Sequence, residues 1–177
     1  MGNIKKIVRC IRNNNPLNIR RGTARWKGIK REEEDEDLSS ARVCSRSAES
    51  KQVSLCSHLD ADFEQFETMA YGWRAAFILL GRTYYEKYHL NTIKKIISRW
   101  APACENRTDA YMMYVAINVG INECDPLPSP KLAPAIWMRI AWAMFEVEAG
   151  RKAANDPSNK ELFFQSMKEG FDMFNNS

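Results

Sequence analysis

Apolar residues recur every three or four positions in the second half of the chain, which is the spacing of amphipathic helices. The first such run begins at residue 68, and its apolar positions are Ala70, Trp73, Phe77, Leu80 and Tyr84. Residues 91–100 repeat the pattern, with Asn91 in the place of an N-cap and Pro102 just beyond the end. The spacing therefore predicts two successive helices.

Two more helices are predicted downstream by the same spacing. Residues 107–120 combine a candidate cap, Thr108, with a terminal glycine. Residues 133–150 form a longer apolar run with Pro134 in the first turn and a glycine past the end.

The last segment, residues 158–176, predicts a fifth helix. Ser158 and Glu161 have the spacing of a capping box. Its apolar positions are Leu162, Phe163, Met167, Phe171 and Phe174. A chain of 177 residues is long enough for one domain with a real core, so residues 1–177 are predicted to form a single domain.

The N-terminal third has a different character. Residues 12–28 read "RNNNPLNIRRGTARWKG", and their Asn, Pro and Gly content predicts a loop or a hairpin. Residues 31–58 are acidic and then serine-rich, which is typical of an exposed insertion loop. The predicted fold class is mainly α: a helical domain with a small irregular or hairpin N-terminal region.

Charge is distributed unevenly along this third. Residues 1–31 contain ten Lys or Arg and no acid, whereas residues 32–37 are six consecutive acids. A basic segment of this kind suits a polyanion, which could be nucleic acid, a membrane surface or an anionic cell wall.

Several classes of protein are disfavoured by the sequence. The five cysteines form no C-x-x-C pair and the two histidines are far apart, so no metal site is expected. There is no G-x-G-x-x-G and no P-loop, and no cofactor is expected. No apolar run approaches the roughly 18 residues of a membrane span. The first residues lack the apolar core of a signal peptide, so cytoplasmic synthesis is expected.

Three segments carry candidate chemistry. The asparagine loop offers amide groups, fixed cations and the flat face of Trp26, a set that could bind a sugar polymer or a nucleic acid. Turn asparagines also bond their own backbone, and composition alone favours that interpretation. Residues 99–111 place Glu105, Asn106 and Asp109 in a loop that leads into a helix, where capping and the helix dipole are the favoured explanation.

The third segment is "MFEVEAG", residues 144–150. Glu146 and Glu148 end a long apolar helix, where the helix dipole disfavours carboxylates. A glutamate there that faces a cleft would have a raised pKa, as a general acid for glycoside cleavage requires. The two side chains point about 200° apart on a helix, so only one can face the cleft.

Blocks in residues 11–120 resemble a family of phage and prophage virion proteins. They are "RNNNPLNIR", "WKG", "FEQF", "GWRA" and "NTIKKIISRWAPACENRTDAY", in this order. The family is expected to have "NNNPGNIR", so Leu17 stands here in place of glycine.

The run "NNNPLNIRRGTARWKG" followed by "FEQFETMAYG" is also similar to a block of bacterial cell-wall glucosaminidases, which have a lysozyme-like fold. In that family the catalytic Glu lies upstream, in an E-S-G stretch at a helix end. Residues 1–11 contain no acid, and "VEAG" at residues 147–150 resembles the missing helix end. The resemblance implies a circularly permuted lysozyme-like arrangement.

This resemblance implies a set of site residues. Glu148 would be the general acid, and Glu67 and Glu105 are candidates for a second carboxylate. The implied substrate-binding residues are Asn14, Asn15, Asn18, Arg20, Trp26, Tyr71, Asn106 and Tyr111.

The resulting hypothesis is a phage-type enzyme that cleaves the glycan strand of peptidoglycan, of the lysozyme, glucosaminidase or lytic transglycosylase type. It would be associated with the virion or released to the cell wall. The first alternative is a non-catalytic virion or wall-binding protein of the same fold, with other virion proteins as partners. A nucleic-acid-binding module is a third and less favoured interpretation, which would bind with a steep salt dependence.

Overall fold

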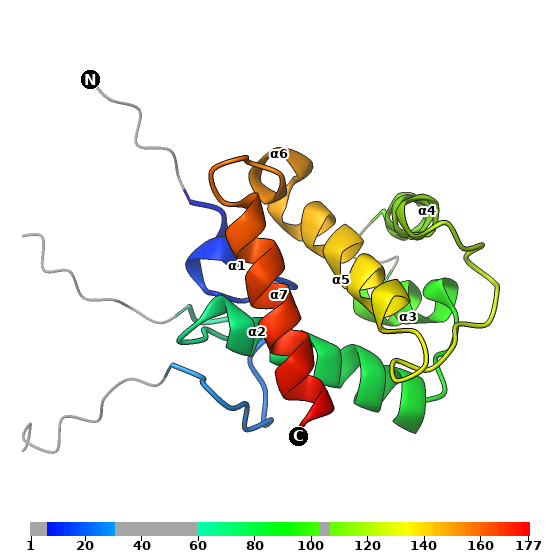
Figure 1. Cartoon of the computed structure of the whole chain (residues 1–177), viewed down its shortest axis with the longest axis horizontal. Coiled ribbons are helices and arrows are strands. Elements are labelled where there is room, and N and C mark those ends of the chain that lie inside the picture. Colours follow the sequence, from blue (N-terminus) through cyan, green and yellow to red (C-terminus); the bar gives the residue numbers. More distant parts are fainter. Residues whose placement is uncertain (1–6, 31–59, 103–106) are drawn as a thin grey trace, which may run out of the picture.

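The computed structural model describes residues 7–30, 60–102 and 107–177, and these ranges are mainly helical, as predicted (Figure 1). The predicted insertion loop at 31–58 lies outside the described residues. The helices are α1 (Arg9–Arg12), α2 (Met69–Phe77), the π-helix η1 (Ile78–Lys87), α3 (Ile93–Trp100), α4 (Thr108–Val119), α5 (Pro134–Ala149), α6 (Arg151–Ala154) and α7 (Lys160–Asn175).

Glycine and proline signals at helix ends are confirmed. Pro134 is the first residue of α5. Gly120 ends α4 in the left-handed conformation, with φ of 73°. Gly150 follows α5 with φ of 79°, a conformation that favours glycine and separates α5 from α6.

Three predicted caps are wrong. Thr92 rather than Asn91 caps α3, because its hydroxyl accepts the Lys95 N–H at 3.2 Å, whereas Asn91 lies in the preceding loop. Thr108 is the first residue of α4, and its hydroxyl donates to a loop carbonyl instead. The capping box at Ser158 does not form, because α7 begins two residues later and no side chain caps it.

The first predicted helix is two elements. α2 continues directly into η1, a π-helix. In a π-helix the backbone hydrogen bonds join residues five apart rather than four. The helical spacing of apolar residues continues through the junction, so the sequence predicted one helix across both.

The core is built where α7 crosses α2 (Figure 1). Gly170 of α7 makes the crossing close: a Cβ at this position would lie 2.4 Å from the Cβ of Trp73. The Trp73 side chain is fully buried, and its ring packs edge-on against Phe145 of α5, with ring centroids 5.5 Å apart. α5 also contacts α4, so it links the crossing of α2 and α7 to α4.

The N-terminal segment is irregular and does not pair with itself as a hairpin. It pairs instead with the segment that leads into α2, through isolated antiparallel bridges from Arg20 to Phe63 and from Ile29 to Phe66. Gly72 of α2 lets the asparagine turn lie directly on the helix, because a Cβ there would be 2.0 Å from the Asn14 carbonyl oxygen. The turn is therefore fixed to the rest of the domain.

Within the described ranges, none of the helices has the length and apolar character that crossing a lipid bilayer requires.

Candidate functional site

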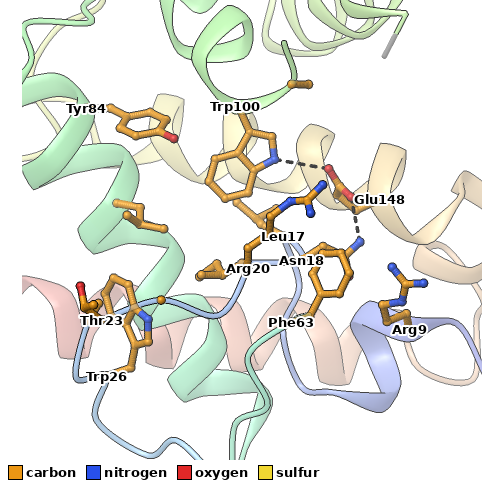
Figure 2. Close-up of a pocket in the computed structure, with 15 residues that line it drawn as sticks. Arg9, Leu17, Asn18, Arg20, Thr23, Trp26, Phe63, Tyr84, Trp100 and Glu148 are labelled. Carbon is orange, nitrogen blue, oxygen red and sulfur yellow. Dashed lines mark hydrogen bonds between the residues drawn. The ribbon is translucent and has the colours of Figure 1, made fainter. Parts of the chain in front are cut away.

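Glu148 lies in the last turn of α5 and is held by three side chains from other segments. The Asn18 amide donates to Oε2 at 2.8 Å. The Trp100 indole N–H and the Tyr111 hydroxyl donate to Oε1 at 3.3 and 3.2 Å. Figure 2 shows the first two of these bonds converging on the carboxyl group. The asparagine loop, the end of α3, the start of α4 and the end of α5 therefore meet at one carboxylate.

The surroundings favour the protonated form of Glu148. Its pKa is raised because burial disfavours the charged carboxylate, and the hydrogen bonds from Asn18, Trp100 and Tyr111 oppose this effect only in part. Burial also raises the pKa of Tyr111 well above its ordinary value, so its hydroxyl remains a donor at neutral pH.

A cleft of about 780 Å³ opens beside Glu148. Four aromatic residues line it: Trp26, Phe63, Tyr84 and Trp100 (Figure 2). Flat apolar ring faces are the surfaces on which the apolar faces of sugars and bases stack. The cleft thus combines a carboxyl group of raised pKa with stacking surfaces.

The predicted asparagines divide into two groups. Asn14 donates to the Phe66 and Glu67 carbonyls at 3.0 and 3.1 Å. The buried Asn15 side chain donates to the Ile19 and Glu64 carbonyls at 2.9 Å each. These amides bond the backbone, as the turn interpretation expects. Of the three asparagines of this loop that were predicted to bind substrate, Asn18 is the one that lines the cleft.

The other predicted residues are distributed unevenly. Arg20 and Trp26 line the cleft. Tyr71 and Glu67 are not among its lining residues: the Tyr71 ring lies against Gly28, and Glu67 is exposed before α2. Tyr111 is buried beneath Glu148 rather than in the cleft. The remaining two candidates, Glu105 and Asn106, lie outside the described residues.

Glu146 is on a different side of α5 from Glu148. It accepts a hydrogen bond from the Tyr114 hydroxyl at 2.8 Å and another from the Asn155 amide. Of the two acids that end this helix, Glu148 is therefore the one that faces the cleft.

The sequence analysis did not assign the side chains of Arg9, Phe63 and Tyr84 to the cleft that they line. It also placed Trp100 on the apolar face of a helix, whereas the indole N–H reaches Glu148. A tryptophan at a helix end, two residues before a proline, is the one local signal for such a role, because its N–H needs a partner when the ring is buried.

In the described ranges, no group of three or more His, Cys, Asp or Glu side chains is placed to hold a metal ion.

Asn18→Gly is expected to raise the pKa of Glu148 further. Asn18 has φ of 51°, so glycine preserves the backbone while removing the amide that stabilises the ionised carboxylate. The pKa would be followed by NMR titration of the labelled glutamate carboxyl carbon. Asn118→Ala, on the exposed part of α4, is the matched control. An unchanged or lowered pKa in Asn18→Gly would contradict the assigned contact.

The free energy of unfolding is expected to depend on pH through Glu148. Because the folded-state pKa is raised, the stability contributed by this group is complete below its ordinary pKa of 4.5 and is lost as pH rises through the folded value. Relative to Glu148→Gln, the native protein should lose stability above pH 4.5. Denaturant unfolding of both proteins between about pH 4 and 8 measures the difference. If the native protein instead lost stability relative to Glu148→Gln as the pH fell, the pKa of Glu148 would be lowered rather than raised.

Fold and site together define a mainly helical domain with one half-buried glutamate at an aromatic cleft. No protein-family model matches the chain. It is 33% identical to Protein P5 of Pseudoalteromonas phage PM2 over 172 residues, which are 96% of this chain and 83% of that protein. The chain belongs to the family of this phage protein, and the predicted relation to phage proteins is confirmed at that level.

Proposed function

We propose that this phage-family protein cleaves the glycan strand of peptidoglycan, with Glu148 as the general acid. The observation that carries the proposal is a half-buried carboxyl group of raised pKa at the edge of a cleft lined by aromatic rings. General acids of glycoside cleavage need a pKa raised in this way. The permuted lysozyme-like arrangement belongs to the same proposal.

The proposed step is a single proton transfer. Oε1 of Glu148 already accepts two hydrogen bonds, whereas Oε2 accepts one, so Oε2 has room for the acidic proton. As the bond between the anomeric carbon and the glycosidic oxygen breaks, its electron pair and the proton of Glu148 pass to the oxygen, and the leaving sugar departs as an alcohol. In the following step the electron-poor anomeric carbon bonds to a water oxygen, which gives a reducing end, or to the C6 hydroxyl of the same sugar, which gives an anhydro end, and the proton released returns to the ionised Glu148. Trp26 and Tyr84 would position the sugar rings by stacking.

Product chemistry tests this reaction directly. Purified sacculi digested with the protein should yield new sugar termini, detected as reducing ends or anhydro ends by mass spectrometry. New amino groups without new sugar termini would mean that a peptide or amide bond is cut, and the proposal would fail.

A non-catalytic wall-binding or virion protein is the second candidate. It is favoured by the three hydrogen bonds that Glu148 accepts, because these also describe a carboxylate that fixes the asparagine loop to α3 and α4. In that case the protein would bind sacculi in a sedimentation assay and release no fragments.

A further inference from the structure

Trp100 is an aromatic residue of the cleft that also contacts the candidate acid. It is the last residue of α3, and its ring forms part of the cleft wall. Its indole N–H donates to Oε1 of Glu148 at 3.3 Å. The second donor to Oε1, Tyr111, is buried beneath the carboxyl group and offers no open ring face. Trp100 therefore joins a stacking surface directly to Glu148.

The helix that carries Trp100 is fixed in the core. Three isoleucines of α3 are fully buried: Ile93, Ile96 and Ile97. Figure 2 shows the indole between Glu148 and Tyr84 of η1, whose ring packs against it at 65° with centroids 6.2 Å apart. The indole is only partly buried, so part of its surface remains open to a ligand. A ring held on a helix in this way is a rigid platform for the apolar face of a sugar.

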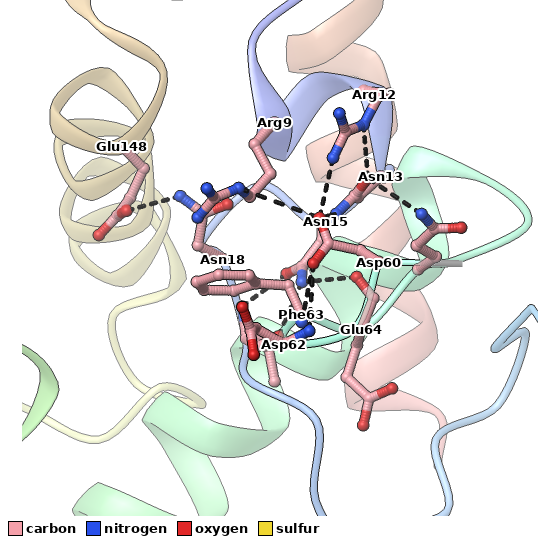
Figure 3. Close-up of polar contacts among 12 residues, drawn as sticks. Arg9, Arg12, Asn13, Asn15, Asn18, Asp60, Asp62, Phe63, Glu64 and Glu148 are labelled. Carbon is pink, nitrogen blue, oxygen red and sulfur yellow. Dashed lines mark hydrogen bonds and ion pairs between the residues drawn. The ribbon is translucent and has the colours of Figure 1, made fainter. Parts of the chain in front are cut away.

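The other oxygen of Glu148 is held by a loop that is itself fixed. The Asn18 amide donates to Oε2 at 2.8 Å, and Figure 3 shows this bond beside the side chains that hold the loop. The Asn13 amide donates to Asp60 at 3.0 Å, and the Asn15 amide donates to two backbone carbonyls. A contact that responds to a ligand is therefore expected on Oε1, where the indole donates.

The hydrogen bond from Trp100 is long for an N–H donor. Such bonds to oxygen are mostly about 2.7–3.2 Å long, whereas this one is 3.3 Å. Hydrogen bonds at catalytic groups are often long in the free enzyme and tighten when substrate binds. A sugar ring on the indole would restrict its motion and favour the shorter bond. The ionised carboxylate left after proton transfer would gain most, because hydrogen bonds to charged groups are the stronger ones.

Trp26 lines the same cleft at a different place. Figure 2 shows it far from Glu148 in the view, whereas Trp100 lies beside the carboxyl group. Trp26 is not one of the three described donors to Glu148. A sugar ring on Trp100 would thus lie next to the acidic proton, and a ring on Trp26 would lie further along the same strand.

We propose that Trp100 is the platform for the sugar ring next to the scissile bond, and that it positions Glu148 for proton transfer to that ring. The inference rests on the proposed function, because it names the subsite at which this acid acts. The glycosidic oxygen of the sugar on Trp100 is the one within reach of Oε2. The ligand class is an oligomer of pyranose sugars, each with an apolar ring face.

Contact with the ligand is measurable without turnover. Glu148→Gln protein, isotope-labelled in its tryptophan indoles, would be titrated by NMR with a peptide-free tetrasaccharide of alternating N-acetylglucosamine and N-acetylmuramic acid. The indole N–H signal of Trp100, assigned by its loss in Trp100→Phe, is expected to shift and to saturate. The signal of Trp137 is the internal control, because this indole is buried and donates to the Pro128 carbonyl at 2.9 Å. Binding that leaves the Trp100 signal unmoved, or no binding at all, would overturn the subsite.

Kinetics on soluble glycan strands test the positioning role with a matched pair of variants. Trp100→Phe keeps a ring for stacking and removes the N–H donor. Its kcat is expected to fall at least about tenfold, as for one hydrogen bond to a charged group, with little change in KM. Trp26→Phe, the same substitution elsewhere in the cleft, should keep the native kcat. Unchanged indole signals of the other tryptophans would show that each variant is folded.

The two outcomes that matter are distinct. Equal kcat in folded Trp100→Phe and Trp26→Phe would overturn the positioning role of Trp100. Failure of the native protein to cut sacculi, with the Trp100 signal still shifting on titration, would refute only the enzymatic proposal and leave Trp100 as a sugar-binding platform.

Discussion

Glu148→Gln is expected to reduce kcat for glycan cleavage by about 10²–10⁴-fold, the usual contribution of a general acid. The substitution keeps the shape of the side chain and removes only the transferable proton. KM should change little, because the cleft walls remain. Rates of fragment release from purified sacculi would measure both constants.

The variant should remain folded for a specific reason. The glutamine oxygen can accept from Trp100 and Tyr111, as Oε1 does in the native protein. Its NH₂ can donate to Oδ1 of Asn18, which is buried and has no partner among the described residues. A rotation of the Asn18 amide therefore pairs Oδ1 with the glutamine NH₂, while the Asn18 NH₂ takes the buried position that Oδ1 had.

Glu146→Gln is the matched control for this result. It is the same change two residues earlier on α5, at a carboxylate bound to Tyr114 and Asn155 and outside the cleft. Its rate should stay close to that of the native protein. A larger loss in Glu146→Gln than in Glu148→Gln would show that the wrong acid has been assigned.

Gly72→Ala is expected to lower the free energy of unfolding by about 2 kcal/mol, within the range for overpacking. Helix propensity alone predicts the opposite, a gain of about 1 kcal/mol, because alanine is the better helix former. The steric clash should outweigh the gain in helix propensity, because the new Cβ would lie 2.0 Å from the backbone oxygen of Asn14. No rotamer change can move a backbone oxygen. Chemical denaturation measures the sign and size of the effect.

The same substitution should also weaken the site. Displacing the asparagine turn moves Asn18, which follows it, away from Glu148. Gly22→Ala is the control for the stability effect, because a Cβ there meets nothing within 4 Å. Stabilisation in Gly72→Ala would contradict the close contact between the loop and α2.

Helices were predictable from the sequence because their signals are local. The apolar spacing of α5 and its flanking Pro134 and Gly150 lie within about 17 residues, and the structure confirms all three. The cap of α3 was misplaced by one residue, because Asn91 and Thr92 are both good caps and only the loop geometry selects Thr92.

The site could be predicted only in part, because its contacts join distant residues. Position at a helix end identified Glu148, but the bond from Asn18 spans 130 residues of sequence. Asparagine amides bind a sugar hydroxyl and a backbone carbonyl equally well. Only the tertiary structure separates Asn15, which bonds the backbone at Ile19 and Glu64, from Asn18 in the cleft.

The two arginines beside the Phe63 ring illustrate a second limit of sequence reasoning. The basic N-terminus indicated a polyanion partner, but the ten basic residues in positions 1–31 do not show which of them would form a binding site. Arg9 and Arg20 acquire a common position because Phe63, from a distant segment, pairs with the N-terminal loop.

Turbidity loss of purified peptidoglycan, measured side by side with folded native protein and folded Glu148→Gln, tests the central claim most directly. The account predicts clearing by the native protein and none, or slower clearing by orders of magnitude, by the variant. Equal clearing by both would contradict the role of Glu148. Clearing by neither would contradict the enzymatic function itself and leave the aromatic cleft as a docking surface.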